Sequence, residues 1–171
     1  MKRYFLTVGM FLLLVMSVTD ASPKVGTVAP DFVGYTVDGD TVRLADLRGQ
    51  VVFLDFWASW CGPCREEMPF LVDFYREHRK QAFQIFAVNI DNKTKNMQKF
   101  LDKLDRQPKF PILFDQKKTI PKLYDIETMP TSIFIDKNGI IRYWHNGFKE
   151  LDEELFYDEL RTLLKKNKEG T

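Results

Sequence analysis

The pattern of hydrophobic and polar residues changes along this chain, so that segments typical of β-strands alternate with segments typical of α-helices. Short β-branched and aromatic runs of strand length occur at residues 50–57, 83–90, 112–114, 131–136 and 140–144. Between them, apolar residues recur every three or four positions, which predicts helices over about 63–81, 92–104, 119–124 and 152–166. Strands that alternate with helices and end in a hairpin predict a mixed α/β sandwich in a single domain.

Turn residues group some of the strand-like runs into two hairpins. Asp38-Gly39-Asp40 separates the β-rich runs 32–37 and 41–44, and Asn138-Gly139 separates the last two strands. Asn-Gly suits the positive φ of a tight turn, so the second hairpin is the stronger prediction. After the first hairpin, residues 44–49 predict a short helical turn that is closed by a glycine.

The N-terminal residues 1–21 differ from the rest of the chain. Lys2 and Arg3 precede an uncharged apolar run that is shorter than the roughly 20 residues needed to span a bilayer. Followed by Thr19-Asp20-Ala21, this run predicts either a cleaved signal peptide or an uncleaved N-terminal anchor. We then expect a linker over 22–27, a folded domain over 28–166 and a polar tail over 167–171.

Composition narrows the class of protein. The chain has 171 residues, of which 44% are hydrophobic and 14% aromatic, and this suits one packed domain rather than a disordered chain. The formal net charge is +1. Binding to nucleic acid would call for a basic surplus, so we expect no nucleic-acid partner.

The chain contains two cysteines, Cys61 and Cys64, placed where the first long strand passes into the first long helix. At a helix N-terminus, unpaired N–H groups and the helix dipole favour negative charge. The pKa of Cys61 would thereby fall from about 8.5 to about 7, which makes it a nucleophile at neutral pH. Cys64 lies one turn further along and can resolve a mixed disulfide. We expect Cys61 to be open to solvent and Cys64 to be shielded.

A purely structural disulfide is the alternative for this pair, since an exported protein can keep its disulfides. However, a Cys-x-x-Cys bridge closes a very short loop and removes little entropy from the unfolded chain. The spacing therefore favours a catalytic or redox use of Cys61 and Cys64.

Asp55 is a charged residue inside the otherwise apolar strand 50–57. A central strand of an α/β sheet is covered on both faces. The carboxyl group would then be buried, its pKa would be raised, and it could take the proton of Cys64. The alternative is a side chain that points to solvent on the other face of the strand.

The residues around the cysteines differ in their expected exposure. We expect Trp57 in the core, and Trp60, on the turn before Cys61, at the surface as part of an apolar collar for substrate. The charged run Arg65-Glu66-Glu67 is expected to be a solvated helix face.

The stretch Asp55-Phe56-Trp57-Ala58-Ser59-Trp60-Cys61-Gly62-Pro63-Cys64 resembles thioredoxins. Over residues 24–166 the chain is most similar to the exported TlpA/ResA-type thiol–disulfide oxidoreductases. Four further features carry this resemblance: Ala29-Pro30-Asp31-Phe32 with its hairpin, Pro69, the segment 92–111, and Met129-Pro130-Thr131 with the final hairpin. The resemblance implies a thioredoxin-like three-layer α/β/α sandwich with a mixed central sheet, an N-terminal β-hairpin extension and an inserted helix.

The same resemblance implies roles for particular residues. Cys61 and Cys64 would form a redox-active disulfide, with no other cofactor, and Asp55 would assist Cys64. The bond before Pro130 would be cis and would hold the neighbouring backbone beside the cysteines, where an extended substrate can pair strand against strand. The expected substrate contacts are Trp60, Gly62, Pro63, Met129, Pro130 and Thr131.

These expectations describe a monomeric enzyme in the periplasm or at the outer face of the bacterial cytoplasmic membrane. It would reduce disulfides of exported proteins. Gly62-Pro63 is the general thioredoxin pair and favours a reductant by resemblance, which requires a membrane electron donor of the DsbD/CcdA kind. Potentials in this fold extend from about −270 mV to about −120 mV, so a disulfide oxidant or isomerase is the alternative. A role in cytochrome c maturation transfers poorly. Members with that role often carry a non-glycine residue after the first cysteine and an acidic residue just after the second core strand, where Asn92 stands here beside Asp91.

Two other classes of function remain open. Ala29-Pro30-Asp31-Phe32 also opens peroxiredoxins, but their Pro-x-x-x-Thr-x-x-Cys pattern is missing around Cys61. A copper-binding module would use Cys61, Cys64 and His145, although the cysteines of such chaperones lie one residue further apart. A zinc site would also need His78, which lies about four helical turns from Cys64. We expect no metal site and both histidines at the surface.

Overall fold

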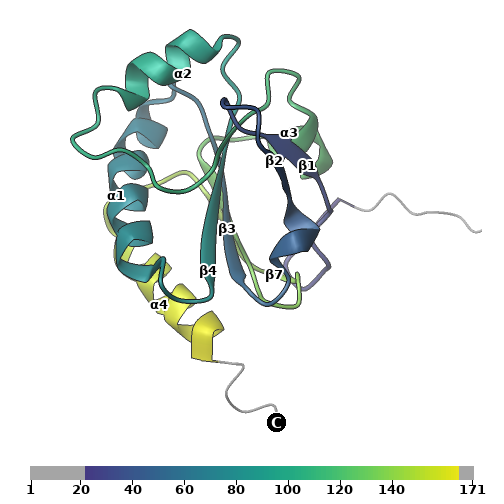
Figure 1. Cartoon of the computed structure of the whole chain (residues 1–171). Coiled ribbons are helices and arrows are strands. Elements are labelled where there is room, and N and C mark those ends of the chain that lie inside the picture. Colours follow the sequence, from purple (N-terminus) through teal and green to yellow (C-terminus); the bar gives the residue numbers. More distant parts are fainter. Residues whose placement is uncertain (1–21, 166–171) are drawn as a thin grey trace, which may run out of the picture.

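The computed structural model describes residues 22–165, which form a five-stranded sheet, a two-stranded hairpin and the helices that cover them (Figure 1). The predicted signal peptide or anchor at 1–21 and the polar tail at 167–171 lie outside the described residues. Within residues 22–165, no helix is both long enough and apolar enough to cross a membrane.

The elements follow the predicted alternation of strands and helices. The hairpin consists of β1 (Val33–Tyr35) and β2 (Thr41–Arg43) and is followed by a 3-10 turn, η1 (Leu44–Leu47). The main strands are β3 (Val51–Trp57), β4 (Phe83–Asn89), β5 (Ile112–Phe114), β6 (Thr131–Ile135) and β7 (Ile141–Asn146). The helices are α1 (Gly62–His78), α2 (Thr94–Leu101), α3 (Thr119–Leu123) and α4 (Asp152–Lys165).

The main sheet has the strand order β5-β4-β3-β6-β7. Strands β3, β4 and β5 run parallel, whereas β6 is antiparallel to β3 and β7 is antiparallel to β6. Every residue of β3 is buried, as expected of a central strand that is covered on both faces. The C-terminal end of β3 therefore delivers the chain to the cysteines at the middle of one edge of the sheet.

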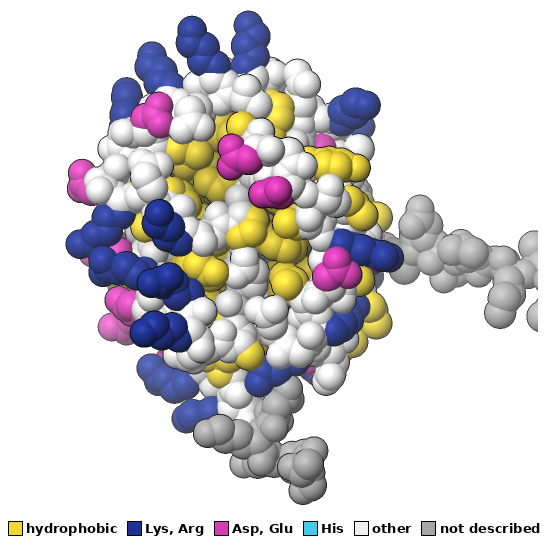
Figure 2. Space-filling view, viewed as in Figure 1, with side chains coloured by type: hydrophobic (Ala, Val, Ile, Leu, Met, Phe, Trp, Pro, Cys, Tyr) yellow, Lys and Arg dark blue, Asp and Glu magenta, His cyan; other side chains and the backbone are white. Residues whose placement is uncertain are grey.

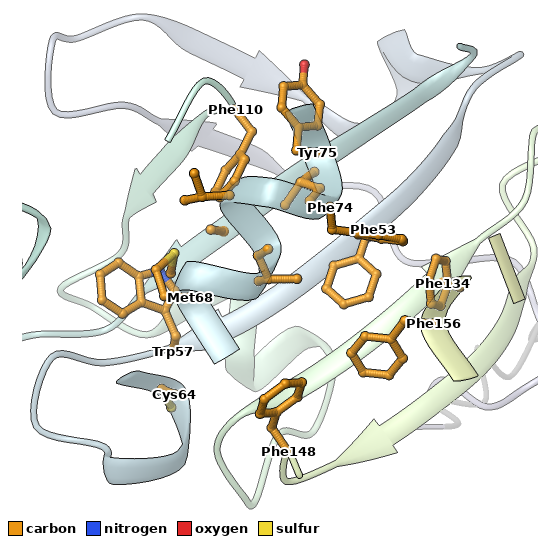
Figure 3. Packing of buried hydrophobic residues seen from close by; sticks show 14 of the residues in the cluster. Phe53, Trp57, Cys64, Met68, Phe74, Tyr75, Phe110, Phe134, Phe148 and Phe156 are labelled. Atoms are coloured by element: carbon orange, nitrogen blue, oxygen red, sulfur yellow. The ribbon is translucent and has the colours of Figure 1, made fainter. Parts of the chain in front are cut away.

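Helices α1 and α4 cover one face of the sheet, and α3 and the hairpin cover the other (Figure 1). Under α1 and α4, the ring of Phe53 packs edge-to-face on Phe134 and Phe156, with centroid distances of 4.7 and 5.3 Å (Figure 3). Such aromatic pairs add stability beyond the area that they bury. The arrangement confirms the predicted three-layer sandwich with a mixed sheet, an N-terminal hairpin and an inserted helix, α2.

The chain before the hairpin is hydrogen-bonded to the final hairpin. The N–H groups of Gly26 and Ala29 donate to the carbonyls of Ile141 and Gly139 at 2.8 and 2.9 Å. Ordered contacts therefore begin inside the segment 22–27, which the sequence predicted to be a linker. Gly139 has a φ of +80°, which confirms the tight turn predicted at Asn138-Gly139.

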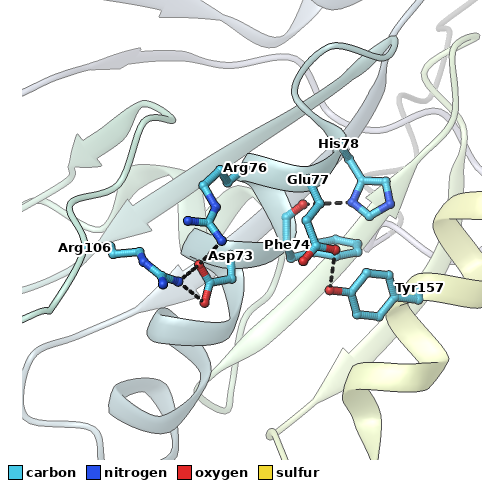
Figure 4. A network of polar contacts seen from close by, with 7 residues as sticks. All are labelled: Asp73, Phe74, Arg76, Glu77, His78, Arg106 and Tyr157. Atoms are coloured by element: carbon cyan, nitrogen blue, oxygen red, sulfur yellow. Dashed lines mark hydrogen bonds and ion pairs between the residues drawn. The ribbon is translucent and has the colours of Figure 1, made fainter.

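Polar contacts fix α1 to its neighbours at the surface (Figure 4). The hydroxyl of Tyr157 on α4 donates to Glu77 at 2.9 Å, and Arg106, after α2, donates to both carboxylate oxygens of Asp73 at 2.6 and 2.9 Å. Exposed ion pairs of this kind contribute little each to stability. They nevertheless fix the position of α1, which has Cys61 as its N-cap and Cys64 in its first turn.

The face of the molecule seen in Figure 2 carries both signs of charge. Lys and Arg side chains gather over α1 and α2, at the left and top of the view, with acidic side chains among them. Apolar side chains show through at the centre of this face. The distribution agrees with the formal net charge of +1.

Candidate active site

Cys61 is the residue that caps the N-terminus of α1. Its backbone is extended, with φ −81° and ψ 118°, and its sulfur accepts the N–H of Cys64 at 3.2 Å. Pro63 lies in the first turn of the helix, where the missing N–H would have no intrahelical partner. The sulfur of Cys61 therefore lies at the positive end of the helix dipole, as the sequence predicted.

Cys61 and Cys64 form a disulfide bond, with their Cα atoms 5.3 Å apart. Cys61 is 6% exposed and Cys64 is 1% exposed. The expectation that Cys61 lies open to solvent is therefore wrong for this oxidised form, because its sulfur turns toward the helix and the Cys64 N–H. Nevertheless, Cys61 lines the neighbouring groove and Cys64 does not.

A groove of about 780 Å³ lies beside the disulfide. Four of the predicted substrate contacts line it: Trp60, Gly62, Pro63 and Met129. Trp60 is 64% exposed, as predicted, whereas Trp57 is buried in the core, also as predicted. The other wall comes from α3 and the residues around it: Lys118, Pro121, Lys122, Asp125, Ile126, Glu127 and Thr128.

The loop Met129-Pro130-Thr131 lies next to the groove. The Met129–Pro130 peptide bond is cis, as the resemblance implies. Pro130 and Thr131 are buried and do not line the groove. The carbonyl of Pro130 accepts the N–H of Gly147 at 2.7 Å, and the hydroxyl of Thr131 donates to the carbonyl of Thr128 at 2.8 Å. Of the three predicted residues in this loop, Met129 alone lines the groove.

Asp55 is fully buried on the face of the sheet that α1 and α4 cover. The expected burial is confirmed, and the alternative of a solvent-facing side chain is wrong. Neither carboxylate oxygen has a hydrogen-bond partner among the described residues. Burial raises the pKa of Asp55 well above its usual range, and the nearby carboxyl group of Glu67 raises it further.

Glu67 is a functional candidate that the sequence reasoning missed. The run Arg65-Glu66-Glu67 was expected to be solvated, but only its first two residues are exposed, and Glu67 is 1% exposed. The hydroxyl of Ser132 donates to Oε1 of Glu67 at 2.7 Å, and Oε2 has no partner in the described part of the chain. Glu67 therefore adds a second buried carboxyl group to the one at Asp55.

The 3.6-residue period of the helix could have identified Glu67 as a core-facing residue. It lies three residues after Cys64 and four before Leu71, on the stripe that faces the core. Burial raises the pKa of Glu67 to about 8; the hydrogen bond from Ser132 opposes this shift, and the charge of Asp152 adds to it. Glu67 can thus take up or release a proton near neutral pH, one helical turn beyond Cys64.

Asp91 holds the turn that precedes the cysteines. Its carboxylate accepts the N–H and the hydroxyl of Ser59 at 3.1 and 3.0 Å and the side-chain amide of Asn89 at 3.0 Å. Asp91 follows β4, and Ser59 follows β3. Because parallel strands end at the same edge of a sheet, this proximity could have been inferred from their order. The contacts fix the position of Trp60.

The two histidines are half-buried, and each therefore lies only partly at the surface. Nδ1 of His78 donates to the carbonyl of Phe74 at 2.8 Å (Figure 4). Nε2 of His145 contacts a carboxylate oxygen of Glu159 at 2.8 Å. Across residues 22–165, no group of three or more His, Cys, Asp or Glu side chains is arranged to hold a metal ion.

Comparison with known proteins gives one family and a consistent set of relatives. The AhpC/TSA family matches residues 25–144. The thiol-disulfide oxidoreductase ResA of Geobacillus thermodenitrificans is 40% identical over 118 residues, 69% of this chain and 67% of that protein. ResA of Oceanobacillus iheyensis is 40% identical over 133 residues, 75% of this chain and 68% of that protein.

Solved structures show the same likeness. A Chlorobium tepidum protein described as a thiol:disulfide interchange protein DsbE superposes with a TM-score of 0.78 at 40% identity. The match covers 84% of this chain and 99% of the other. The fold of this chain is thus shared with a protein of similar sequence.

Proposed function

The chain belongs to the AhpC/TSA family and is a thioredoxin-like thiol–disulfide oxidoreductase, and we propose that it reduces disulfides of exported proteins through Cys61 and Cys64. The observation that carries this proposal is the Cys61–Cys64 disulfide at the N-terminus of α1, with one of its sulfurs beside an open groove. No cofactor beyond the two thiols enters the proposed reaction.

In the first step, the thiolate of reduced Cys61 attacks one sulfur of a substrate disulfide. A bond forms between Cys61 and that sulfur, and the other substrate sulfur leaves as a thiolate. The N-terminus of α1 stabilises the thiolate of Cys61, because its N–H groups and dipole face the sulfur.

In the second step, Cys64 loses its proton and attacks the sulfur of Cys61. The Cys61–Cys64 disulfide forms, and the remaining substrate sulfur leaves as a thiolate, so that two electrons pass from the enzyme to the substrate. Asp55 takes the proton of Cys64, and Glu67 shares it, since the raised pKa of each carboxyl group suits proton transfer near neutrality.

The groove supports an extended polypeptide as the substrate. Trp60, Pro63 and Met129 offer apolar surface on both sides of Cys61. A segment laid between them would place its own disulfide against the sulfur of Cys61. Pro130 and Thr131 act in this proposal by holding Met129 in place.

The sequence supports a proposed site of action outside the cytoplasm. The basic and apolar residues 1–21 support export to the periplasm or retention at the outer face of the cytoplasmic membrane. A reductant there needs electrons from the cytoplasm, so we propose a membrane electron carrier of the DsbD/CcdA kind as the donor. The enzyme is proposed to act as a monomer.

The redox potential tests the direction of the reaction. The protein is equilibrated with mixtures of reduced and oxidised glutathione, and the fraction of Cys61–Cys64 disulfide is measured by mass spectrometry after alkylation. We expect a potential closer to about −270 mV than to about −180 mV. A value above about −180 mV would make the protein an oxidant or isomerase and would overturn the reductive role.

A further inference from the structure

A row of polar side chains crosses the main sheet beneath α1 and α4. Asp55 on β3 stands opposite Ser132 on β6, and Ser132 stands opposite His145 on β7. Residues opposite each other in neighbouring strands project from the same face, with Cβ atoms about 4.5–5.5 Å apart. The adjacent row on this face is aromatic, consisting of Phe53, Phe134 and Tyr143.

The two covering helices each add an acidic side chain to this row. Glu67 on α1 accepts the hydroxyl of Ser132 at 2.7 Å, and Glu159 on α4 contacts Nε2 of His145 at 2.8 Å. The charge of Glu67 adds to the effect of burial in raising the pKa of Asp55, which places the two carboxyl groups near each other. We call these five residues the polar row: Asp55, Glu67, Ser132, His145 and Glu159.

Stability alone does not account for the polar row. Buried carboxyl groups without full hydrogen bonding cost free energy, and apolar side chains of similar volume would often pack there with equal or better stability. Both oxygens of Asp55 and one oxygen of Glu67 lack partners among the described residues. The rest of this face is a continuous aromatic and aliphatic core.

The polar row joins the neighbourhood of Cys64 to the surface. Glu67 lies one helical turn beyond Cys64 on the same face of α1, and Asp55 is fully buried beside it. At the other end, the side chain of His145 on the edge strand β7 is 19% exposed. Imidazole is the side chain best suited to exchange a proton with water near neutral pH.

The proposed reaction needs an exit route for a proton during its second step, when Cys64 resolves the mixed disulfide. When Cys64 gives up its proton, the mixed disulfide still joins the substrate to Cys61, and the substrate fills the groove in front of the cysteines. A proton accepted by Asp55 then has a blocked path on the groove side. The polar row leads away from the groove, to the partly exposed His145 on the edge strand β7.

We propose that the proton released by Cys64 leaves the core along the polar row, from Asp55 and Glu67 through the hydroxyl of Ser132 to the His145–Glu159 pair. The proposal rests on the proposed function, in which Cys64 is the resolving thiol. The S–H bond of Cys64 breaks and a carboxyl O–H bond forms. Each later step moves one proton from donor to acceptor until water takes it at His145, and no electrons travel along the row.

The charged groups that face the row belong to the row or to the start of α4. Asp152, in the first turn of α4, acts on Glu67. Glu159 faces His145 from the same helix, and Asp55 faces Glu67 from β3. Because all of these partners are acidic, they favour the presence of a proton in the row.

Ellman's reagent separates the two thiol steps. With reduced protein, the first release of thionitrobenzoate reports attack by Cys61, and its rate rises with reagent concentration. The second release reports attack by Cys64 on the mixed disulfide, and its rate does not depend on concentration. Stopped-flow measurement over pH 6–9 therefore tests the route separately from the nucleophile.

We expect His145→Gln and Glu159→Gln each to slow the second release about tenfold while leaving the first release unchanged. Ser132→Ala, which removes the hydroxyl from the middle of the row, should do the same. An unchanged first release also shows that each variant is folded. The control is His78→Gln, since His78, the last residue of α1, is also half-buried but bonds to a backbone carbonyl instead of the row (Figure 4).

A second release within twofold of the wild-type rate in all three row variants, at every pH, would overturn the proposed route. In that case Asp55→Asn would still slow the second release if the proposed mechanism holds. If instead the first release persists in Cys61→Ser and is lost in Cys64→Ser, the proposed function itself fails.

Discussion

The hydroxyl of Ser132 donates a hydrogen bond of 2.7 Å to Oε1 of Glu67. This bond joins β6, which follows the cis-proline loop, to α1, which carries both cysteines. Ser132 is also the residue opposite Asp55 in the sheet. One hydroxyl thus joins β6 to α1, next to the strand position of the buried Asp55.

Replacement of Asp55 should slow resolution of the mixed disulfide. In Asp55→Asn the carboxylate that accepts the proton of Cys64 is absent, so the second release of thionitrobenzoate should fall by about 10- to 100-fold near pH 7. Its rise with pH should also flatten. Asp158→Asn, an exposed acid on α4, serves as the control. Equal second-release rates in wild type and Asp55→Asn across pH 6–9 would remove Asp55 from the mechanism.

Glu67 should make the oxidised protein less stable as the pH rises. Its pKa is raised by burial from 4.5 to about 8, so the folded state binds more protons than the unfolded state between these values. Its contribution is therefore full below about pH 4.5 and is lost progressively up to about pH 8. Between pH 5 and pH 8 the loss is at most about 4 kcal/mol.

Urea unfolding of the oxidised protein at pH 5 and pH 8 measures this effect. The free energy of unfolding of wild type should decrease over this range, and Glu67→Gln should lose a large part of the decrease. If Glu67→Gln shows the same pH dependence as wild type, the carboxyl group of Glu67 is already ionised in the folded protein at neutral pH, and its pKa is not raised by burial.

Trp60 should contribute to substrate binding and little to folding. Its side chain is 64% exposed at the rim of the groove. Trp60→Ala should raise KM for a peptide disulfide by roughly 5- to 30-fold, as loss of an aromatic anchor does at other interfaces. The free energy of unfolding should change by less than about 0.5 kcal/mol. Leu151→Ala is the control, since Leu151 is exposed but outside the groove; equal KM values in both variants would contradict the assignment.

Asp91 should stabilise the turn before the cysteines. Asp91→Ala leaves the N–H and hydroxyl of Ser59 and the amide of Asn89 without their acceptor, so the free energy of unfolding should fall by about 2–4 kcal/mol. Asp105→Ala, which removes an exposed acid, should change it by less than about 0.5 kcal/mol. A similar small loss in both variants would show that these hydrogen bonds do not hold the turn.

The sequence alone was enough to predict those features of the fold and the site that a local pattern of residues determines. Asn138-Gly139 predicts the turn at which Gly139 has φ +80°, and the apolar run 50–57 predicts the central strand. Trp57 and Trp60 were separated correctly because one lies inside that run and the other on the turn after it. The cysteines were placed at the start of α1 for the same reason.

The sequence alone was not enough to predict the burial and contacts of residues that pack against segments distant in the chain. Glu67 is charged and follows Arg65-Glu66, so its composition suggested solvent, yet it faces Ser132 from a strand 65 residues away. His145 was expected at the surface and is 19% exposed, but its contact with Glu159 on α4 could not be predicted from the sequence. Thr131 matches a substrate-binding loop in sequence, but it is buried and its hydroxyl is bonded to the carbonyl of Thr128.

The central claim is that Cys61 attacks the substrate and Cys64 resolves the intermediate. The direct measurement is mass spectrometry of reduced Cys64→Ser and Cys61→Ser after each is mixed with a peptide that contains a disulfide. We predict that Cys64→Ser accumulates a mixed disulfide at Cys61 and that Cys61→Ser forms none at the same time points. Accumulation of the mixed disulfide in Cys61→Ser, with none in Cys64→Ser, would contradict this assignment of the two thiols.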